Sequence, residues 1–302
     1  AEELAPRNRL ASIDAGPRVP TLEERNAKQL QSRWQPLSPE AVDLTRRRTN
    51  AMIRIIAKYR RPFCAANGVL VVVPHNGLSN ATDAGQIAAA LDDDLRIVAK
   101  AGQTRCPSWL LVADLHTIPG FDALFRSLDQ ERRQRLLARD LPFQPDLAAD
   151  AVDAMATSAI ASFLASLSLL AQKLFMLETS HAGAAQAILT NGKLFELIEH
   201  LEQRRAGLEI VIRRIIHGNA PDGLYFGGFY LAATGADPQS DQAFVPGVFR
   251  LMVDHQNKVA WTDEALEEEA DYQRWAIFGY AAMGAFCLLL VVLGYWRWHG
   301  VG

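Results

Sequence analysis

The chain has 302 residues, of which 49% are hydrophobic and 22% are charged. This balance is that of a folded protein, and the length allows one or two domains of ordinary size. The net charge of −3 gives no support for a general nucleic-acid-binding protein. The three cysteines, Cys64, Cys106 and Cys287, lie far apart and form no Cys-x-x-Cys pair. A disulfide framework and a cysteine zinc site are therefore excluded as organising features, and a reducing compartment fits the composition.

The first fifty residues are polar and rich in proline, which predicts loops and short helices. The chain shows no apolar signal segment at its start and begins with Ala1 rather than Met. We therefore expect a processed chain or a piece of a longer protein.

Residues 1–145 alternate between helical and strand patterns. Helices are predicted over Thr45–Tyr59, Asp83–Ala101 and Phe121–Arg139, and strands over Val69–Val73 and Trp109–Ala113. The first strand is a run of five apolar residues, four of them β-branched, which is typical of a strand buried on both faces of a parallel sheet. The order of strand, helix, strand and helix predicts an α/β domain with a right-handed crossover over residues 1–145.

Two kinds of charge cluster fall within this domain. Asp92, Asp93 and Asp94 are consecutive and lack the alternating ligands and glycine turn of a calcium loop, so we interpret them as a solvated part of a helix. Arginines cluster at 46–48 and at 60–61 without interleaved aromatic residues. These clusters are weak evidence for nucleic acid and fit a surface near anionic lipid equally well.

From residue 146 to 265 the pattern becomes mainly helical. Helices are predicted over Asp150–Glu178, Leu194–His217 and Ala243–Asp254, and a strand over Tyr225–Thr234 that is bent or closely approached by backbone at Gly227 and Gly228. Residues 154–172 carry no charge, so their composition also allows a second membrane span. Five Ser or Thr residues dilute this stretch and acidic residues flank it. A packed helix is expected, and membrane association of 154–172 stays open.

Residues 275–296 form an uncharged apolar run. As a helix it would be about 33 Å long at 1.5 Å per residue, which is enough to cross a hydrocarbon layer of about 30 Å. The aromatic side chains of Trp275, Tyr280, Tyr295 and Trp296 lie near its two ends, as in an aromatic belt. We predict a transmembrane helix with these residues as its anchors, because a buried core helix seldom runs this long without a polar face.

Charges outside this run give its orientation. Lys258 and Arg274 precede the run, whereas only Arg297 follows it closely. Because Lys and Arg prefer the cytoplasmic side, the bulk of the chain is expected in the cytoplasm, with the acidic residues 267–271 solvated before the membrane.

Catalytic patterns are lacking in the sequence. The seven histidines form no His-x-x-x-His pair, and there is no Gly-x-Ser-x-Gly motif. We therefore predict no metal, no cofactor and no catalytic residue. The residues alone indicate a membrane-anchored α/β domain followed by a helical domain.

Several segments, in order, resemble the cytoplasmic region and third membrane helix of the IcmF/TssM family, an inner-membrane component of type VI secretion systems. The resemblance rests on the segments Asn67–Val73, Trp109–Phe121, Phe125–Arg133, Leu224–Tyr230 and Phe244–Trp261, and on the apolar run. It covers roughly residues 60–300. No single motif carries it; the order of the segments does.

This resemblance implies a partial, small-GTPase-like parallel sheet whose nucleotide motifs are degenerate. The phosphate loop Gly-x-x-x-x-Gly-Lys-Ser/Thr is absent from the sequence. Asp14 and Gly16 are either a remnant of the family's Asp-x-x-Gly segment or an ordinary turn. Asp114 and His116 stand where the family's guanine-reading motif has Lys and Asp. An Asp cannot pack on the base as that Lys does, so the resemblance implies a structural role rather than nucleotide hydrolysis.

The expected function is that of a membrane scaffold. The resemblance implies a bacterial inner-membrane protein, an oligomer within a larger complex, that contacts a TssL-type membrane protein, baseplate components and lipid, but no nucleic acid. The family's large periplasmic region is missing after Gly302, so a fragment and a reduced paralogue both stay open. Two alternatives remain: a tail-anchored NTPase-like switch whose phosphate loop lies upstream, and a membrane-anchored adaptor unrelated to secretion.

Overall fold

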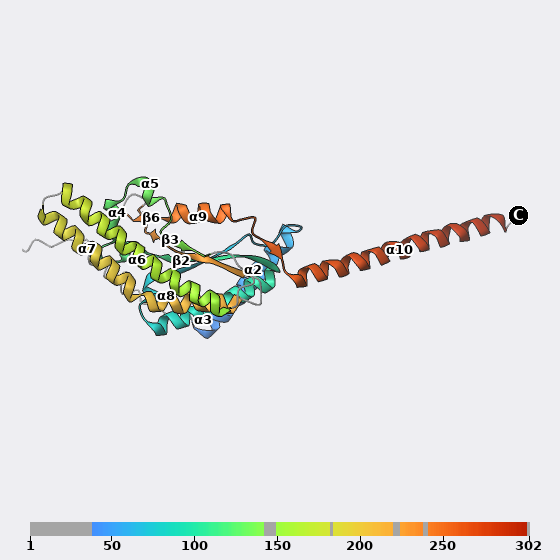
Figure 1. The fold of residues 1–302 in the computed structure, drawn as a ribbon. Coiled ribbons are helices and arrows are strands. Elements are labelled where there is room, and N and C mark those ends of the chain that lie inside the picture. Colours follow the sequence, from blue (N-terminus) through green and yellow to red (C-terminus); the bar gives the residue numbers. More distant parts are fainter. Residues whose placement is uncertain (1–37, 142–148, 182–183, 220–223, 238–240, 301–302) are drawn as a thin grey trace, which may run out of the picture. The chain divides into compact units, whose positions relative to one another are not determined.

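The computed structural model describes residues 38–141, 149–181, 184–219, 224–237 and 241–300. These residues form a mixed α/β fold built on a mainly parallel sheet and a long apolar C-terminal helix, as the sequence predicts (Figure 1). The sheet has five strands: β1 (Val69–Pro74), β2 (Thr104–Ala113), β3 (Ala138–Asp140), β4 (Leu224–Leu231) and β7 (Ala260–Trp261). The predictions that concern residues 1–37 lie outside the described residues.

Strand β2 occupies the centre of this sheet. It pairs in parallel with β1 on one side and with β4 on the other, and its first two residues also pair antiparallel with β7. Strand β3 is antiparallel to β4, which gives the order β1-β2-β4-β3. The strands of this sheet therefore come from both sides of the domain boundary that the sequence suggests at residue 145.

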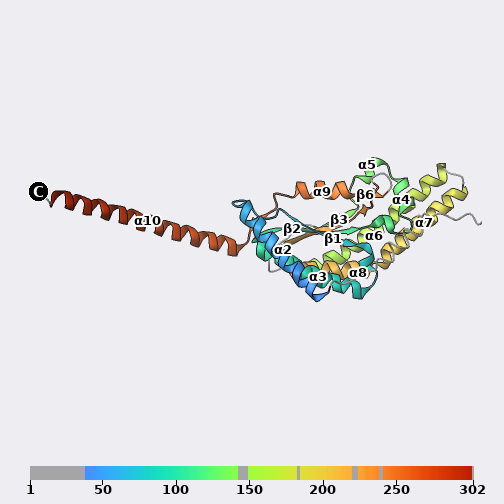
Figure 2. The same cartoon turned by 180° about the vertical axis from the view of Figure 1, so that it is seen from behind.

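The helices form layers on the two faces of the sheet. The helices α3 (Ala81–Gly102), α6 (Ala149–His181) and α8 (Arg205–Asn219) lie on one face, and α9 (Val245–Asp254) lies on the other (Figures 1 and 2). On the first face, Phe163 of α6 packs edge-on against Phe229 of β4, with ring centroids 5.5 Å apart. On the second face, Trp109 of β2 stacks on His255, which follows α9, at 6.2 Å. The fully buried core thus lies along β2 and β4.

Strand β1 is less buried than the sequence predicts. Val71 and Val73 are buried, but Val72, whose side chain points to the opposite face, is 56% exposed. Burial on both faces was therefore a wrong prediction, because β1 is an edge strand and only one of its faces is fully covered. The second strand begins at Thr104, five residues earlier than expected. Pro107 is tolerated inside it because pairing with β1 starts only at Ser108, next to a register shift.

The helix expected over Phe121–Arg139 is divided. The structure has α4 (Phe121–Ser127), α5 (Gln130–Arg133) and then β3. Leu128 is extended, and the Asp129 side chain accepts a hydrogen bond of 2.7 Å from the Arg132 amide, which starts a new helix. A continuous helix was wrong because this N-cap and the pairing of β3 with β4 compete with it.

Three other predicted helices have different bounds in the structure. The pattern over Leu194–His217 covers parts of α7 (Ala184–Gln203) and α8, which are separated at Arg204. The helix predicted over Ala243–Asp254 is α9, which starts at Val245. Ala243 belongs instead to β6 (Gln242–Ala243), which pairs with β5 (Ala233–Thr234). The first predicted helix, Thr45–Tyr59, lies within the longer α2 (Pro39–Arg60), whose N-cap is Ser38.

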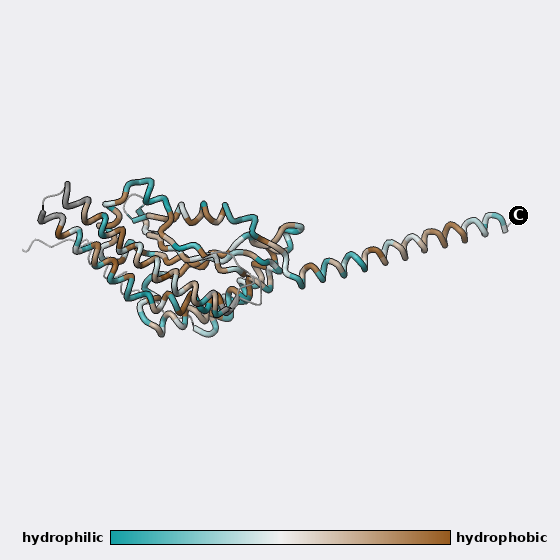
Figure 3. Tube along the Cα trace, in the orientation of Figure 1, coloured by the Kyte–Doolittle hydropathy of each residue, from teal (hydrophilic) through white to brown (hydrophobic). Residues whose placement is uncertain are grey.

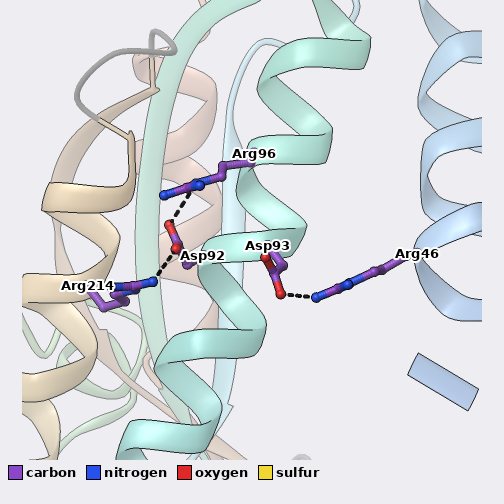
Figure 4. Close-up of polar contacts among 5 residues, drawn as sticks. All are labelled: Arg46, Asp92, Asp93, Arg96 and Arg214. Carbon is purple, nitrogen blue, oxygen red and sulfur yellow. Dashed lines mark hydrogen bonds and ion pairs between the residues drawn. The ribbon is translucent and has the colours of Figure 1, made fainter. Parts of the chain in front are cut away.

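Asp92 is a buried member of an ion-pair cluster rather than a solvated residue (Figure 4). Its side chain is only 3% exposed and contacts Arg214 of α8 at 2.6 Å and Arg96 of α3 at 3.3 Å. The prediction was wrong because α8 packs along the α3 face that carries Asp92. On the next position, Asp93 points to the other side of α3 and pairs with Arg46 of α2, where both side chains are 44% exposed (Figure 4).

Gly228 confirms the close backbone approach predicted within the fourth strand. Its φ is +137°, and a Cβ placed there would lie 2.5 Å from the carbonyl oxygen of Arg139 in β3. Only glycine avoids both the strained conformation and this contact.

We predict that Gly228→Ala lowers the free energy of unfolding by more than about 2 kcal/mol, because it adds backbone strain and displaces β3. Gly85→Ala is the matched control. A Cβ at Gly85 meets nothing within 4 Å on helix α3, so this change should raise stability by up to about 1 kcal/mol. Urea denaturation of the detergent-solubilised chain measures both. Equal effects of the two substitutions would contradict the role given to Gly228.

Arg214→Met should destabilise the chain by about 3 kcal/mol, because it leaves the buried Asp92 carboxylate with Arg96 as its remaining cation. The same change at Arg46 breaks an ion pair at the surface and should cost at most about 1 kcal/mol. The two variants are compared by their urea midpoints. If Arg46→Met lowers stability as much as Arg214→Met does, burial of the carboxylate does not determine the cost of breaking its ion pair.

Candidate functional site

The parallel strands β1, β2 and β4 end at one edge of the sheet, where open α/β folds bind their ligands. The segments that follow them are η1 (His75–Leu78), η2 (Leu115–Thr117) and β5. Asp114 comes directly after β2 and His116 lies within η2, so both predicted motif positions are at this edge. Asp14 and Gly16 lie outside the described residues, so the structure says nothing of a remnant motif there.

Asp114 is held in a closed turn. Its φ is +64°, in the left-handed region that Asp tolerates better than most residues. The Thr234 hydroxyl donates to Asp114 Oδ1 at 2.7 Å and accepts from the Asp114 amide at 3.1 Å. The Asp114 carbonyl accepts from the Thr117 hydroxyl at 2.9 Å. Asp114 therefore links the end of β2 to the segment that follows β4. These hydrogen bonds give Asp114 a structural role in the turn.

His75 continues this network into the core. Its Nε2 lies 2.6 Å from the Thr117 hydroxyl oxygen, whose own proton is directed to Asp114. Nε2 must therefore be the donor, and Nδ1 is a buried acceptor without a partner among the described residues. Burial, and next the positive charge of Arg204, lower the pKa of His75 to about 4. The imidazole is neutral at pH 7 and serves as a fixed hydrogen-bond donor.

Among the described residues, the cavity beside His75 is too small for a nucleotide. The cavity beside His75 has a volume of about 20 Å³, and its lining is mostly apolar. Ligand pockets usually measure about 300–1,000 Å³. His116 is half-buried against Gly235, where a Cβ would lie 3.0 Å from its ring. In the part of the chain that the structure describes, no group of three or more His, Cys, Asp or Glu residues could hold a metal ion.

The second predicted site is the membrane anchor, which forms part of α10 (Asp263–His299). Trp275, Tyr280, Tyr295 and Trp296 are all 63–75% exposed, and none of the helix's apolar window is buried against the described protein. Figure 3 shows the change from polar to apolar residues along this helix. The composition and length of α10 suit a membrane span.

A second helix passes the same test of length and composition. The segment Asp153–Met176 of α6 is 39% buried in its most apolar window, compared with 0% for α10. Its buried side chains include Ile160, Phe163 and Leu167, which face the sheet layer. One face of α6 is therefore used for packing, which distinguishes it from α10.

The start of α10 is attached to the central strand at the opposite edge of the sheet. Strand β7 pairs with the first two residues of β2, and the Thr262 amide donates to the Gln103 carbonyl at 3.1 Å. Arg105 of β2 pairs with Asp263 at 2.5 Å, and Gln103 Nε2 donates to Glu268 at 2.9 Å. Sequence reasoning missed this attachment, because nothing in a two-residue strand or in these spacings marks it.

The pKa of His75 predicts a dependence of stability on pH. In the unfolded chain a histidine takes up its proton near pH 6.5, whereas folded His75 takes it up only near pH 4. The unfolded state therefore binds more protons between these values, and stability falls as the pH is lowered through this window, by about 3 kcal/mol in total. Above pH 6.5 this group has no effect.

The variant His75→Gln tests this, since its amide can still donate to Thr117 but does not titrate. Denaturation midpoints at pH 7 and pH 4 should differ less in the variant than in the native chain. An unchanged difference would assign the pH dependence to other groups.

Comparison with known families agrees with the order of segments along the chain. The family model of the IcmF-related N-terminal domain matches residues 45–237, which is more than half of the chain. This range includes β1 to β4 and the helices between them. No curated protein and no solved structure matches the chain. On the strength of the family match, the chain belongs to the IcmF-related family.

Proposed function

We propose that this chain is a membrane-anchored structural scaffold of the IcmF/TssM type, a component of a type VI secretion membrane complex. In this proposal the span of α10 crosses the bacterial inner membrane and the α/β body lies in the cytoplasm. The body docks a TssL-type membrane protein and baseplate components, and copies of the chain assemble within the larger complex.

The observation that carries this proposal is the attachment of α10 to the sheet. Only Thr262 separates α10 from β7, and β7 pairs with β2, the strand on which the core is built. A membrane helix on a flexible linker would only tether the body. Here hydrogen bonds and an ion pair join the first turns of α10 to Gln103 and Arg105, so force on the anchor reaches the central strand. Such a connection suits a load-bearing part of a membrane complex.

The carboxyl edge of the sheet supports a structural rather than an enzymatic role. Asp114 is engaged in a turn with Thr234, and the cavity beside His75 is far smaller than a nucleotide. We therefore infer that the chain is not a nucleotide hydrolase by itself. A switch that borrows a phosphate loop from upstream sequence would bind nucleotide in a longer chain, and calorimetry on that chain tests it.

The anchor and the scaffold are tested together in native bacterial membranes. The tagged chain should resist carbonate extraction, and its capture in detergent should recover secretion membrane proteins. A variant with Phe286→Arg and Leu289→Arg should be released by carbonate and lose these proteins, because each charge at the centre of a span costs about 3 kcal/mol.

Tyr272→Arg is the control for this variant. It adds a charge to the same helix three residues before the apolar run and should behave like the native chain. Release of the native chain by carbonate would refute the span. Retention of the chain in the membrane, with capture of no secretion protein, would refute the scaffold and leave an unrelated adaptor.

A further inference from the structure

An open cavity of about 740 Å³ lies at the edge of the sheet where α10 begins. It is bounded by the C-terminal halves of α2 and α3 and by the first turns of α10. Four cations line it, Arg54, Lys58 and Arg61 from the end of α2, and Lys100 from α3. These side chains come from the last two turns and the C-cap of one helix and from its neighbour, so the fold concentrates them in one place.

The positive charge of this cluster is not balanced within the described ranges. None of the four cations takes part in an ion pair there, and Arg54 only donates to the neutral Asn50 at 3.2 Å. The cavity also contains Glu264 and Glu268 of α10, so its lining keeps an excess of positive charge. Glu268 is already bound by Gln103. An anion is the ligand that such a lining favours.

The cluster lies close to the membrane surface. Glu268 is seven residues before Trp275, a rise of about 10 Å along one continuous helix. The headgroup layer occupies roughly 5–8 Å of that distance on each side of the hydrocarbon. The part of the cavity at the level of Glu268 is then within about one Debye length, roughly 8 Å, of the headgroups. Tyr59 and Phe63, at the same end of α2, are 80% and 70% exposed, as interfacial aromatic residues are.

We propose that Arg54, Lys58, Arg61 and Lys100 bind the phosphate of an anionic phospholipid in the leaflet that α10 enters. This inference rests on the proposed membrane span of α10 but not on the scaffold role. A single membrane helix leaves the whole chain free to rotate about the helix axis within the membrane. The lipid contact is a second attachment that fixes which face of the body is directed toward the membrane.

Native mass spectrometry of the full chain in detergent tests this with phosphatidylglycerol and phosphatidylcholine as probes. The native chain should bind phosphatidylglycerol selectively. Each basic residue near an anionic surface contributes about fivefold to the affinity. The triple variant Arg54→Gln, Lys58→Gln and Arg61→Gln should therefore bind phosphatidylglycerol about a hundredfold more weakly.

The matched control removes the same charge from the other end of the sheet. Arg126→Gln, Arg132→Gln and Arg135→Gln change exposed residues on and after α4 and α5, and lipid binding should stay unchanged. Glu264→Gln removes an anion from the cavity and should tighten phosphatidylglycerol binding by about fivefold, which a damaged fold would not produce.

Equal binding of the two lipids, or an equal loss in the two triple variants, would overturn the inference. Displacement of the lipid by millimolar inorganic phosphate would also overturn it, because the site would then serve a soluble anion. These outcomes differ from a failure of the anchor, which carbonate extraction of the same chain reports separately.

Discussion

The structure depends on the requirement that the buried strand β2 satisfy its backbone hydrogen bonds on both edges. A buried amide or carbonyl without a partner costs as much as a lost hydrogen bond, so a central strand needs neighbours wherever they are in the sequence. One neighbour, β1, is local. The other, β4, begins more than a hundred residues later, at Leu224. The helices α6, α7 and α8 lie between them in sequence, and α6 and α8 cover the face of the sheet that this pairing creates.

The same strand gives the two ends of the sheet different properties. At its carboxyl end, β2 turns at Asp114 into a network with Thr234, Thr117 and His75, beside a cavity of only about 20 Å³. At its amino end, the pairing with β7 leads directly into α10, beside an open cavity lined by cations. A strand of ten residues spans roughly 30 Å, so the closed end and the membrane end are well separated. The fold thus keeps the edge at Asp114 away from the start of α10.

How far the sequence could predict this structure follows from the range of the interactions involved. The apolar runs of β1 and β2, the helix α3 and the span of α10 are local patterns, and the sequence predicts each of them. The burial of Asp92 could not be predicted, because it depends on Arg214, which is 122 residues away. Strand β3 has three residues and no pattern of its own, and it exists because β4 offers an unpaired edge.

In the candidate sites too, local features can be predicted from the sequence, whereas contacts between distant segments cannot. The candidate span can be predicted from the sequence because its apolar residues are consecutive. Asp114 and His116 follow β2 in the structure, but the turn that closes around Asp114 depends on Thr234 of β5, 120 residues later in the sequence. The cation cluster combines α2 and α3 with the start of α10, so no single stretch of sequence shows it.

The connection between α10 and the sheet consists of several contacts, each of which contributes little free energy. The Arg105–Asp263 pair is exposed and contributes at most about 1 kcal/mol, and a two-residue pairing of β7 with β2 adds little more. Under load these contacts open before the core of β2 and β4 does. A second attachment of the body to the membrane surface shares the load with them. The excess of positive charge beside α10 lies next to this connection, so the proposed attachment would act directly on it.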